Sequence, residues 1–268
     1  MLDKYKNKVN LMCYNIFFKD VAERSRNIQD LILKNDPDVL LLQEVSVSWI
    51  PYLQNFMARY GYSYYGYGRH GNEMSGTYSD DREQFTPILW KTEKYDLKDS
   101  GHFWLSSTPD TYSSDWSDGT TSKFPRCVNW VILHDKCTGG EFMALCIHTD
   151  PENDDVRTKS SMLTVKMVDK IRGELPMAMG GDWNMLLEDE AYHAVVEGGY
   201  PDARFIAKTA MKGGSFNAWG KRTEENYAYG DHIFVSDNMA AESFEVVDDY
   251  YDGVHISDHC PLKTVLYY

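Results

Sequence analysis

Carboxylate, amide and imidazole side chains stand at the ends of several apolar segments of the 268-residue chain. The apolar segments are typical of buried strands, and the polar residues at their ends are Glu44, His148, Asp182, Asn184, Asp258 and His259. Carboxylate and amide oxygens suit a hard cation such as Mg²⁺. Histidine adds a group that exchanges a proton near neutral pH. If the strand ends meet, this set has the chemistry of a metal-assisted hydrolytic site.

Glu44 and Asn15 each have a second interpretation. Glu44 follows the apolar residues 39–42 and Gln43, and it is either a metal ligand or the point where a strand reaches solvent. Asn15 lies inside the apolar stretch LMCYNIFF, where a buried amide needs a hydrogen-bond partner. It is therefore either a satisfied core amide or a residue that serves a metal site, and the two interpretations are about equally supported.

Asp182 and Asn184 occur in the segment GGDWN, directly after the apolar run MAM. Residues two apart share one face of an extended chain. One side chain could then orient a water molecule or take its proton while the other steadies an oxyanion. An Asx turn explains the same spacing, and for a DxN motif taken alone it is the better interpretation.

The dipeptide Asp-His occurs twice, at positions 231–232 and 258–259. His148 and His255 also stand next to polar residues at strand ends. An Asp beside a His is common by chance, so each signal is weak alone. Glu, His, Asp/Asn and Asp/His at four separate strand ends together indicate a divalent-metal hydrolase.

The elements that would position these residues follow one order twice. Each half of the chain has a strand, an amphipathic helix and a second strand, expected at 9–16, 20–35 and 39–42, and at 141–147, 155–172 and 177–179. Further strands are expected at 88–90, 96–104, 128–133, 231–235 and 263–267. Residues 64–83 and 109–123, rich in Gly, Ser, Asp and Tyr, predict long loops, which are often functional. With no low-complexity linker, we expect one domain, residues 1–268, of stacked sheets covered by helices.

The charge balance limits the classes of partner. The chain has 27 Lys and Arg against 41 Asp and Glu, a net charge of −14. This argues against binding nucleic acid through a broad basic face, because phosphate neutralisation needs Lys and Arg. It leaves a nuclease open, since a bound cation would add local positive charge.

The five cysteines are odd in number and contain no CxxC motif, so buried free thiols are expected at Cys13 and Cys146. No stretch approaches the length of an apolar membrane span. The segment MLDKYKNKVN has no signal-peptide core, so we expect a cytoplasmic protein, with a secreted parent and removed signal as the alternative.

Taken in order, the polar segments resemble the endonuclease/exonuclease/phosphatase superfamily of metal-dependent phosphohydrolases, which includes AP endonucleases, pancreatic-type deoxyribonucleases and sphingomyelinases. The matching segments are YNI, LLQEV, REQFTPILW, CIHTD, GGDWN, GDHIFV and SDHCPL. They span almost the whole chain in the right order, and GHFWLSSTPD and PRCVNW resemble a bacterial branch. The resemblance implies an α/β fold, a four-layer α-β-β-α sandwich of two mixed sheets flanked by helices, with the site at one edge.

The resemblance also implies how a metal and a water molecule would be held. Glu44 is the expected main ligand of Mg²⁺, for which Mn²⁺ could substitute, and Asn15 and Asp258 assist it. Asp182 would orient or deprotonate the attacking water. Asn184 would bind the phosphate.

Two histidines complete the implied site. His259, paired with Asp231, would contact the phosphate and stabilise its developing charge. His148, paired with Glu83, would be a second phosphate contact or the acid for the leaving group. Phosphoryl transfer needs this kind of positioning and charge neutralisation more than covalent chemistry.

The chain departs from the common pattern at three positions. Trp183 replaces a Phe, Thr149 replaces a Leu, and His232 replaces a Tyr and adds a histidine near the site. Arg126 and Arg157 are candidate phosphate contacts, with a structural role equally supported for each.

The first functional hypothesis is a Mg²⁺-dependent phosphohydrolase that cleaves a phosphodiester. The alternatives within this class are a nuclease acting on DNA or RNA and a phosphomonoesterase acting on a sugar or inositol phosphate. The loops at 62–83 and 109–123 are expected to decide among them. A binding module without activity is the alternative of another class, although no expected Asp, His or Glu is missing. We expect a monomer whose partner is a phosphate ester, either a small molecule or nucleic acid.

Overall fold

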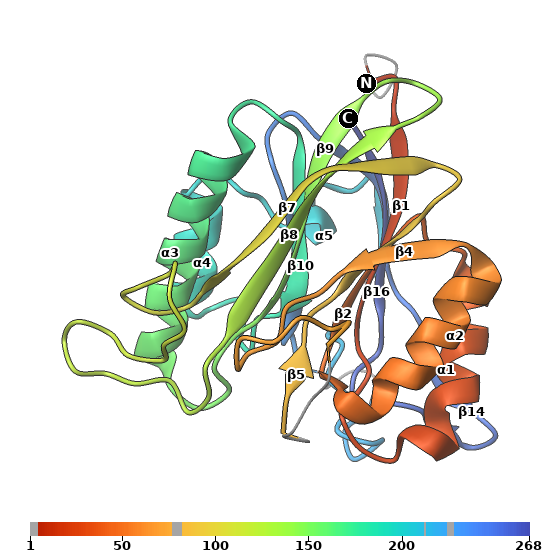
Figure 1. Ribbon diagram of the computed structural model, residues 1–268, viewed down its shortest axis with the longest axis horizontal. Helices are drawn as coiled ribbons and strands as arrows, with labels where there is room; N and C mark the ends of the chain where they lie inside the picture. Colours follow the sequence, from red (N-terminus) through yellow and green to blue (C-terminus); the bar gives the residue numbers. More distant parts are fainter. Residues whose placement is uncertain (1–4, 77–81, 212, 224–227) are drawn as a thin grey trace.

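Two mixed β-sheets face each other, and helices cover the outer face of each sheet (Figure 1). The computed structural model describes residues 5–76, 82–211, 213–223 and 228–268. Positions 77–81 of the expected loop 64–83 lie outside the described residues. The layering confirms the expected α-β-β-α sandwich.

The larger sheet has the strand order β11-β13-β16-β1-β2-β6-β4. Its strands are β1 (Lys8–Asn15), β2 (Val39–Gln43), β4 (Tyr62–Tyr65), β6 (Ile88–Lys91), β11 (Thr209–Ala210), β13 (Ala240–Val246) and β16 (Leu262–Tyr267). Helix α1 (Val21–Asn35) links β1 to β2, which pair in parallel. β16 and β6 flank this parallel pair in the antiparallel sense.

The smaller sheet has the order β12-β10-β9-β8-β7 and repeats this construction. Its strands are β7 (Tyr95–Trp104), β8 (Cys127–Asp135), β9 (Glu141–His148), β10 (Met177–Asp182) and β12 (Asp231–Val235). Helix α3 (Asp154–Arg172) links the parallel strands β9 and β10. Asn153 caps this helix by accepting hydrogen bonds from the backbone N–H groups of Asp155 and Val156.

Shorter elements complete the chain. They are β3 (Val45–Ser46), η1 (Val47–Trp49), α2 (Ile50–Tyr60), β5 (Gln84–Phe85), α4 (Glu190–Glu197), α5 (Ala203–Ile206), β14 (Tyr250–Tyr251) and β15 (Val254–His255). The sequence interpretation did not anticipate α2, α4, α5 or β13, and β4 lies at the start of the segment 62–83 that was expected to be a loop. No described helix is long and apolar enough to cross a membrane.

Three apolar clusters hold the layers together. The central cluster lies between the sheets and includes Cys13, Leu41, Cys146 and Ala178. The outer clusters join α1 and α2 to the larger sheet, and α3 and α4 to the smaller one. Cys13 and Cys146 are buried free thiols, as predicted.

The two glycines of GGDWN allow close packing beside the site. A Cβ atom on Gly181 would lie 2.0 Å from the backbone oxygen of Ile147 on β9. A Cβ atom on Gly180 would lie 2.8 Å from Leu41 Cδ1 on the opposite sheet. Glycine is therefore required for backbone clearance at 181 and for sheet-to-sheet contact at 180.

Candidate active site

The ends of four strands meet at one edge of the sandwich. β1 ends at Asn15, β9 ends at His148 and β10 ends at Asp182, while Glu44 directly follows β2. Parallel pairing places His148 opposite Asp182. Between the sheets, Asn15 Nδ2 donates a hydrogen bond to Asp182 Oδ2 at 3.0 Å. The repeated strand-helix-strand order therefore brings the predicted residues together.

A cleft of about 950 Å³ opens at this edge. The sequence-predicted residues that line it are Glu44, Arg126, His148, Asp182, Asn184, Asp258 and His259. Asn15 and Asp231 lie directly behind it and are buried. The lining thus contains carboxylates as well as arginines and aromatic rings.

Glu44 has an unusual backbone conformation, with φ 60°. Non-glycine residues rarely adopt this left-handed region, and those that do cluster at functional sites. The Glu44 carboxylate accepts hydrogen bonds from Asn15 Nδ2 at 3.3 Å and from the Phe18 N–H at 3.2 Å. These bonds fix the carboxylate at the cleft.

Asp182 is 3% exposed. Its pKa is raised to about 7, chiefly by burial; the charge of His259 lowers it, and the carboxylates of Asp231 and Glu44 add to the rise. Its Oδ1 accepts a hydrogen bond from the Asn184 N–H at 3.0 Å, and Asn184 has φ 49°. The chain therefore makes the Asx turn and still brings both side chains to the cleft.

Three carboxylates, one of them buried and two half-buried, provide a donor set that fits a divalent cation. Glu44, Asp182 and Asp258 all line the cleft. Burial raises the pKa of Asp258, and the negative charge of Glu44 acts in the same direction. Converging carboxylates that are shielded from water are costly unless a positive charge compensates them. Asn15 presents its amide nitrogen to two of them, Glu44 and Asp182, and so holds these two carboxylates in position.

His259 and Asp231 form a buried pair. His259 Nδ1 lies 2.7 Å from Asp231 Oδ2, which also accepts a hydrogen bond from Ser215 Oγ. Burial alone would lower the pKa of His259, but the charges of Asp231 and Asp182 outweigh it and raise the pKa well above its ordinary value. His259 is therefore an imidazolium at neutral pH, suited to contact a phosphate.

His148 has the opposite charge preference. Burial lowers its pKa well below the ordinary value, and the positive charges of Arg126 and His259 add to this effect. Its Nε2 lies 3.5 Å from Asp182 Oδ2. A neutral imidazole suits a hydrogen-bonded phosphate contact better than it suits proton donation to a leaving group.

Arg126 and Arg69 line the same cleft as the carboxylates. The two guanidinium groups lie 5.8 and 4.7 Å from the centre of the Phe124 ring. Arg126 is 6% exposed, and no described residue accepts a hydrogen bond from its guanidinium. Burial and the charge of Arg69 lower the pKa of Arg126 to about 10, so it stays charged at neutral pH. A buried guanidinium without a protein acceptor is a ready anion site.

The expected pairing of Glu83 with His148 requires a correction. The Glu83 carboxylate accepts hydrogen bonds from the His70 N–H at 3.0 Å and from Asn72 Nδ2 at 2.5 Å. It also lies 3.4 Å from His70 Nδ1. Glu83 therefore secures the turn that carries Arg69, whereas His148 has Asp182 as its carboxylate neighbour.

Three other predicted residues lie away from the cleft. His232 is fully buried, and its Nδ1 lies 2.9 Å from Asp202 Oδ2. Strand alternation turns its side chain to the opposite face of the sheet from Asp231, so this extra histidine is not at the site. Trp183 is also buried and packs edge-on against Phe234. Arg157 bonds the Asp150 backbone oxygen at 3.1 Å and Asp154, which is a structural role.

Arg69, Phe124 and Phe216 line the cleft but were not anticipated. Arg69 lies in the loop GYGRHG, where a single basic residue among glycines was the available signal. The loop expected at 62–83 thus contributes Arg69 and Arg82 to the cleft, while the loop at 109–123 leads into Phe124.

The sequence pattern of the Endonuclease/Exonuclease/phosphatase family matches residues 12–259. The chain belongs to this family. Its members are phosphoric ester hydrolases, and the protein is an enzyme of this class. A search of curated protein sequences found no match.

Solved structures of the family have the same fold. An endonuclease/exonuclease/phosphatase family protein from Bacteroides thetaiotaomicron is 26% identical, with a TM-score of 0.85 and 98% of each chain covered. A mannosyl-6-phosphatase from the same organism is 26% identical, with a TM-score of 0.84 over 97% of this chain and 100% of that one. D. rerio TDP2 complexed with single-strand DNA product is 17% identical, with a TM-score of 0.74 over 98% and 100%, which shows a shared fold.

Proposed function

We propose that the enzyme hydrolyses a phosphate monoester of a small molecule, such as a sugar phosphate, with Mg²⁺ held by Glu44 and Asp258 and with Asp182 left to act on the water. The observation that carries this proposal is the buried Arg126, a cation that lines the cleft and has no hydrogen-bond acceptor among the described residues. A monoester is close to a dianion at neutral pH and ends in three non-bridging oxygens. A diester has one charge and a substituent on each side of phosphorus. A guanidinium enclosed in the cleft favours the terminal phosphate of a monoester over the substituted phosphate of a diester.

Charge and similarity support the same substrate class. The net charge of −14 disfavours a polyanion, whereas a small ester needs only the local arginines. The mannosyl-6-phosphatase resembles this chain over its full length at 26% identity. The similarity to the DNA-bound TDP2 is lower and concerns the fold.

The side chains have distinct tasks in the reaction. When bound, the cation would neutralise charge on the phosphoryl oxygens and leaving group. Asp182 accepts a proton from the water whose oxygen attacks phosphorus, while the bond from phosphorus to the ester oxygen breaks and that oxygen takes up a proton from solvent to leave as the alcohol. Its raised pKa makes it a better base than an ordinary aspartate at neutral pH.

The remaining side chains bind the phosphoryl group. The His259 imidazolium and the Asn184 amide donate to its oxygens, and Asp231 keeps His259 charged and oriented. Arg126 and neutral His148, which also line the cleft, contact it as well. Such donors stabilise the transition state most when they are fixed in place beforehand.

A substrate panel tests this proposal. Hexose 6-phosphates, p-nitrophenyl phosphate, bis(p-nitrophenyl) phosphate and single-stranded DNA would be compared at equal Mg²⁺, with and without chelator. We expect a hexose phosphate to have the highest kcat/KM, and chelator to abolish turnover. Preferred cleavage of the diester or DNA would replace the monoester assignment, and full activity in chelator would refute the metal.

A further inference from the structure

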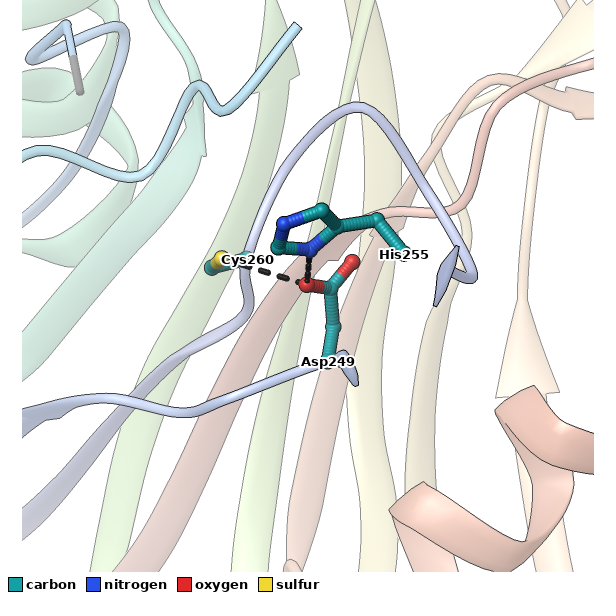
Figure 2. Close-up of side chains that lie close together, drawn as sticks. All are labelled: Asp249, His255 and Cys260. Carbon is teal, nitrogen blue, oxygen red and sulfur yellow. Dashed lines mark hydrogen bonds and ion pairs between the residues drawn. The ribbon is translucent and has the colours of Figure 1, made fainter. Parts of the chain in front are cut away.

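Asp249, His255 and Cys260 converge outside the hydrolytic cleft (Figure 2). Asp249 directly precedes β14, His255 ends β15, and Cys260 lies just before β16. One ligand atom from each, a carboxylate oxygen, a ring nitrogen and a sulfur, lies within 4.8 Å of the other two. Three different ligand types are thus directed at a common point.

The convergence is centred on one carboxylate oxygen. Asp249 Oδ1 accepts from His255 Nδ1, and Cys260 Sγ lies 3.3 Å from the same oxygen. The other oxygen, Oδ2, accepts from the Ser257 N–H at 3.2 Å, which fixes the carboxylate plane. Asp249 is fully buried and Cys260 is 4% exposed.

A second, independent feature lies beside this cluster. The Tyr14 hydroxyl on β1 is buried, and no described group forms a hydrogen bond with it. Burial raises the pKa of the Tyr14 hydroxyl, and the charge of Asp249 acts in the same direction, which places this hydroxyl within electrostatic reach of the cluster. An orphaned hydroxyl at this point leaves an additional oxygen donor for a ligand of the cluster.

A route from solvent reaches the cluster. His255 lines a cavity of about 510 Å³ together with Trp219, Tyr250 and Val254. The last two are exposed, whereas Asp249 behind them is not. An ion can therefore enter at the imidazole and meet the buried oxygen and sulfur behind it.

The geometry points to a second metal site, in which Asp249, His255 and Cys260 bind a thiophilic divalent ion of the zinc class. Sulfur, imidazole nitrogen and carboxylate oxygen are all zinc ligands, and three of them leave a fourth position open. Mg²⁺ avoids sulfur and requires oxygen donors. The two sites therefore differ in the ion that they select.

Binding would replace hydrogen bonds by metal bonds. The Cys260 thiol loses its proton to solvent, and His255 binds through Nδ1 as a neutral imidazole that keeps one proton, on Nε2. Without an ion, the same groups form a hydrogen-bonded network around Asp249, which is the competing structural explanation.

The site would stabilise the segment that carries two cleft residues. Cys260 directly follows Asp258 and His259, and Asn217 Nδ2 lies within hydrogen-bond distance of both the Ser257 oxygen and Cys260 Sγ. An ion bound to Cys260 would hold this segment at its end without contacting the phosphate.

Cobalt spectroscopy on the full chain tests the site directly. Protein stripped with chelator would be titrated with Co²⁺, in an excess of Mg²⁺ to occupy the cleft. We expect about one Co²⁺ per chain with tetrahedral absorption and a thiolate-to-cobalt charge-transfer band. The cleft is lined by no described cysteine, so this band reports on the second site. Zn²⁺ should displace the Co²⁺ and remove the band.

Variants assign the band to its residues. Cys260→Ser should remove it and weaken Zn²⁺ binding at least about tenfold, because even outer partners of metal sites contribute about that much. His255→Ala, at a more exposed position, provides a second variant if Cys260→Ser does not fold. Cys137→Ser changes an exposed thiol outside the cluster and should leave the band intact. Absence of the band in the wild type, or its persistence in both site variants, would overturn the proposal, whatever the substrate of the cleft.

Discussion

Asp231 Oδ2 lies 2.7 Å from His259 Nδ1, and the imidazole thereby faces the cleft with its other nitrogen, Nε2, 3.7 Å from Asp182 Oδ2. This relationship couples the charge of one histidine to two carboxylates. It explains why the pKa of His259 is raised although the residue is buried. The effect of Asp231 on the charge of His259 should therefore be visible in the pH dependence of catalysis.

Asp231→Asn should reduce kcat/KM by about 10²-fold and move the alkaline limit of activity to lower pH. The sign follows from the charge: Asp231 raises the pKa of His259, so the imidazolium persists at higher pH in the wild type. The attraction between His259 and Asp231 stabilises the fold fully at pH values below the ordinary pKa of histidine. This stabilisation is lost as the pH rises through the raised pKa of His259. A pH–rate profile measures the shift. An unchanged alkaline limit would show that His259 is not the group being titrated.

Arg126→Ala should lower kcat/KM for the monoester substrate by about 10²–10³-fold and affect a diester less. The guanidinium has no described protein acceptor, so its loss leaves no buried carboxylate unpaired. Arg26→Ala, which changes an exposed arginine on α1, is the control. Equal losses for both esters would show that Arg126 does not select the terminal phosphate.

Glu83→Gln should raise KM with little change in the pH–rate profile. Glu83 secures the turn at His70 and Asn72, and so the position of the neighbouring Arg69, but it does not contact His148. Substrate binding should therefore weaken while the titrating groups stay the same. A shifted profile would restore the pairing of Glu83 with His148 that the structure replaces.

Gly181→Ala should destabilise the fold by about 3 kcal/mol, and Gly180→Ala by about 1 kcal/mol. The new Cβ meets a backbone oxygen 2.0 Å away at position 181, which cannot move aside. At 180 it meets the end of the Leu41 side chain at 2.8 Å, which can change rotamer. Urea unfolding of the two variants measures the difference. A larger loss for Gly180→Ala would contradict this account of their packing.

Apolar periodicity predicted most of the fold, because strands such as β2 and β10 are buried on both faces and contain continuous apolar runs. The same logic located Glu44, His148 and Asp182, since parallel strands joined by helices end at one edge. Helix α2 was not predicted because Trp49, the residue at its N-cap, provides no side-chain cap.

The partners of individual side chains could not be predicted in the same way. The side chain of His232 turns away from the cleft because of strand alternation, which the dipeptide Asp-His does not reveal. Glu83 reaches a loop 11 to 13 residues earlier in the chain instead of His148. Such contacts depend on loop conformations and on which buried groups need a partner, and no local pattern encodes either.

The central claim is that the buried Asp182 carboxylate serves catalysis and lowers the stability of the fold. Asp182→Asn tests this claim most directly. The pKa of Asp182 is raised from 3.8 to about 7, so its ionisation destabilises the metal-free fold increasingly between these pH values. At pH 8 the variant without metal should be more stable by on the order of 2–4 kcal/mol, with a higher Tm. Its kcat should nevertheless fall by about 10³-fold or more, and Mg²⁺ should raise its Tm less than that of the wild type. A variant that keeps wild-type turnover, or that loses stability together with activity, would contradict the assignment.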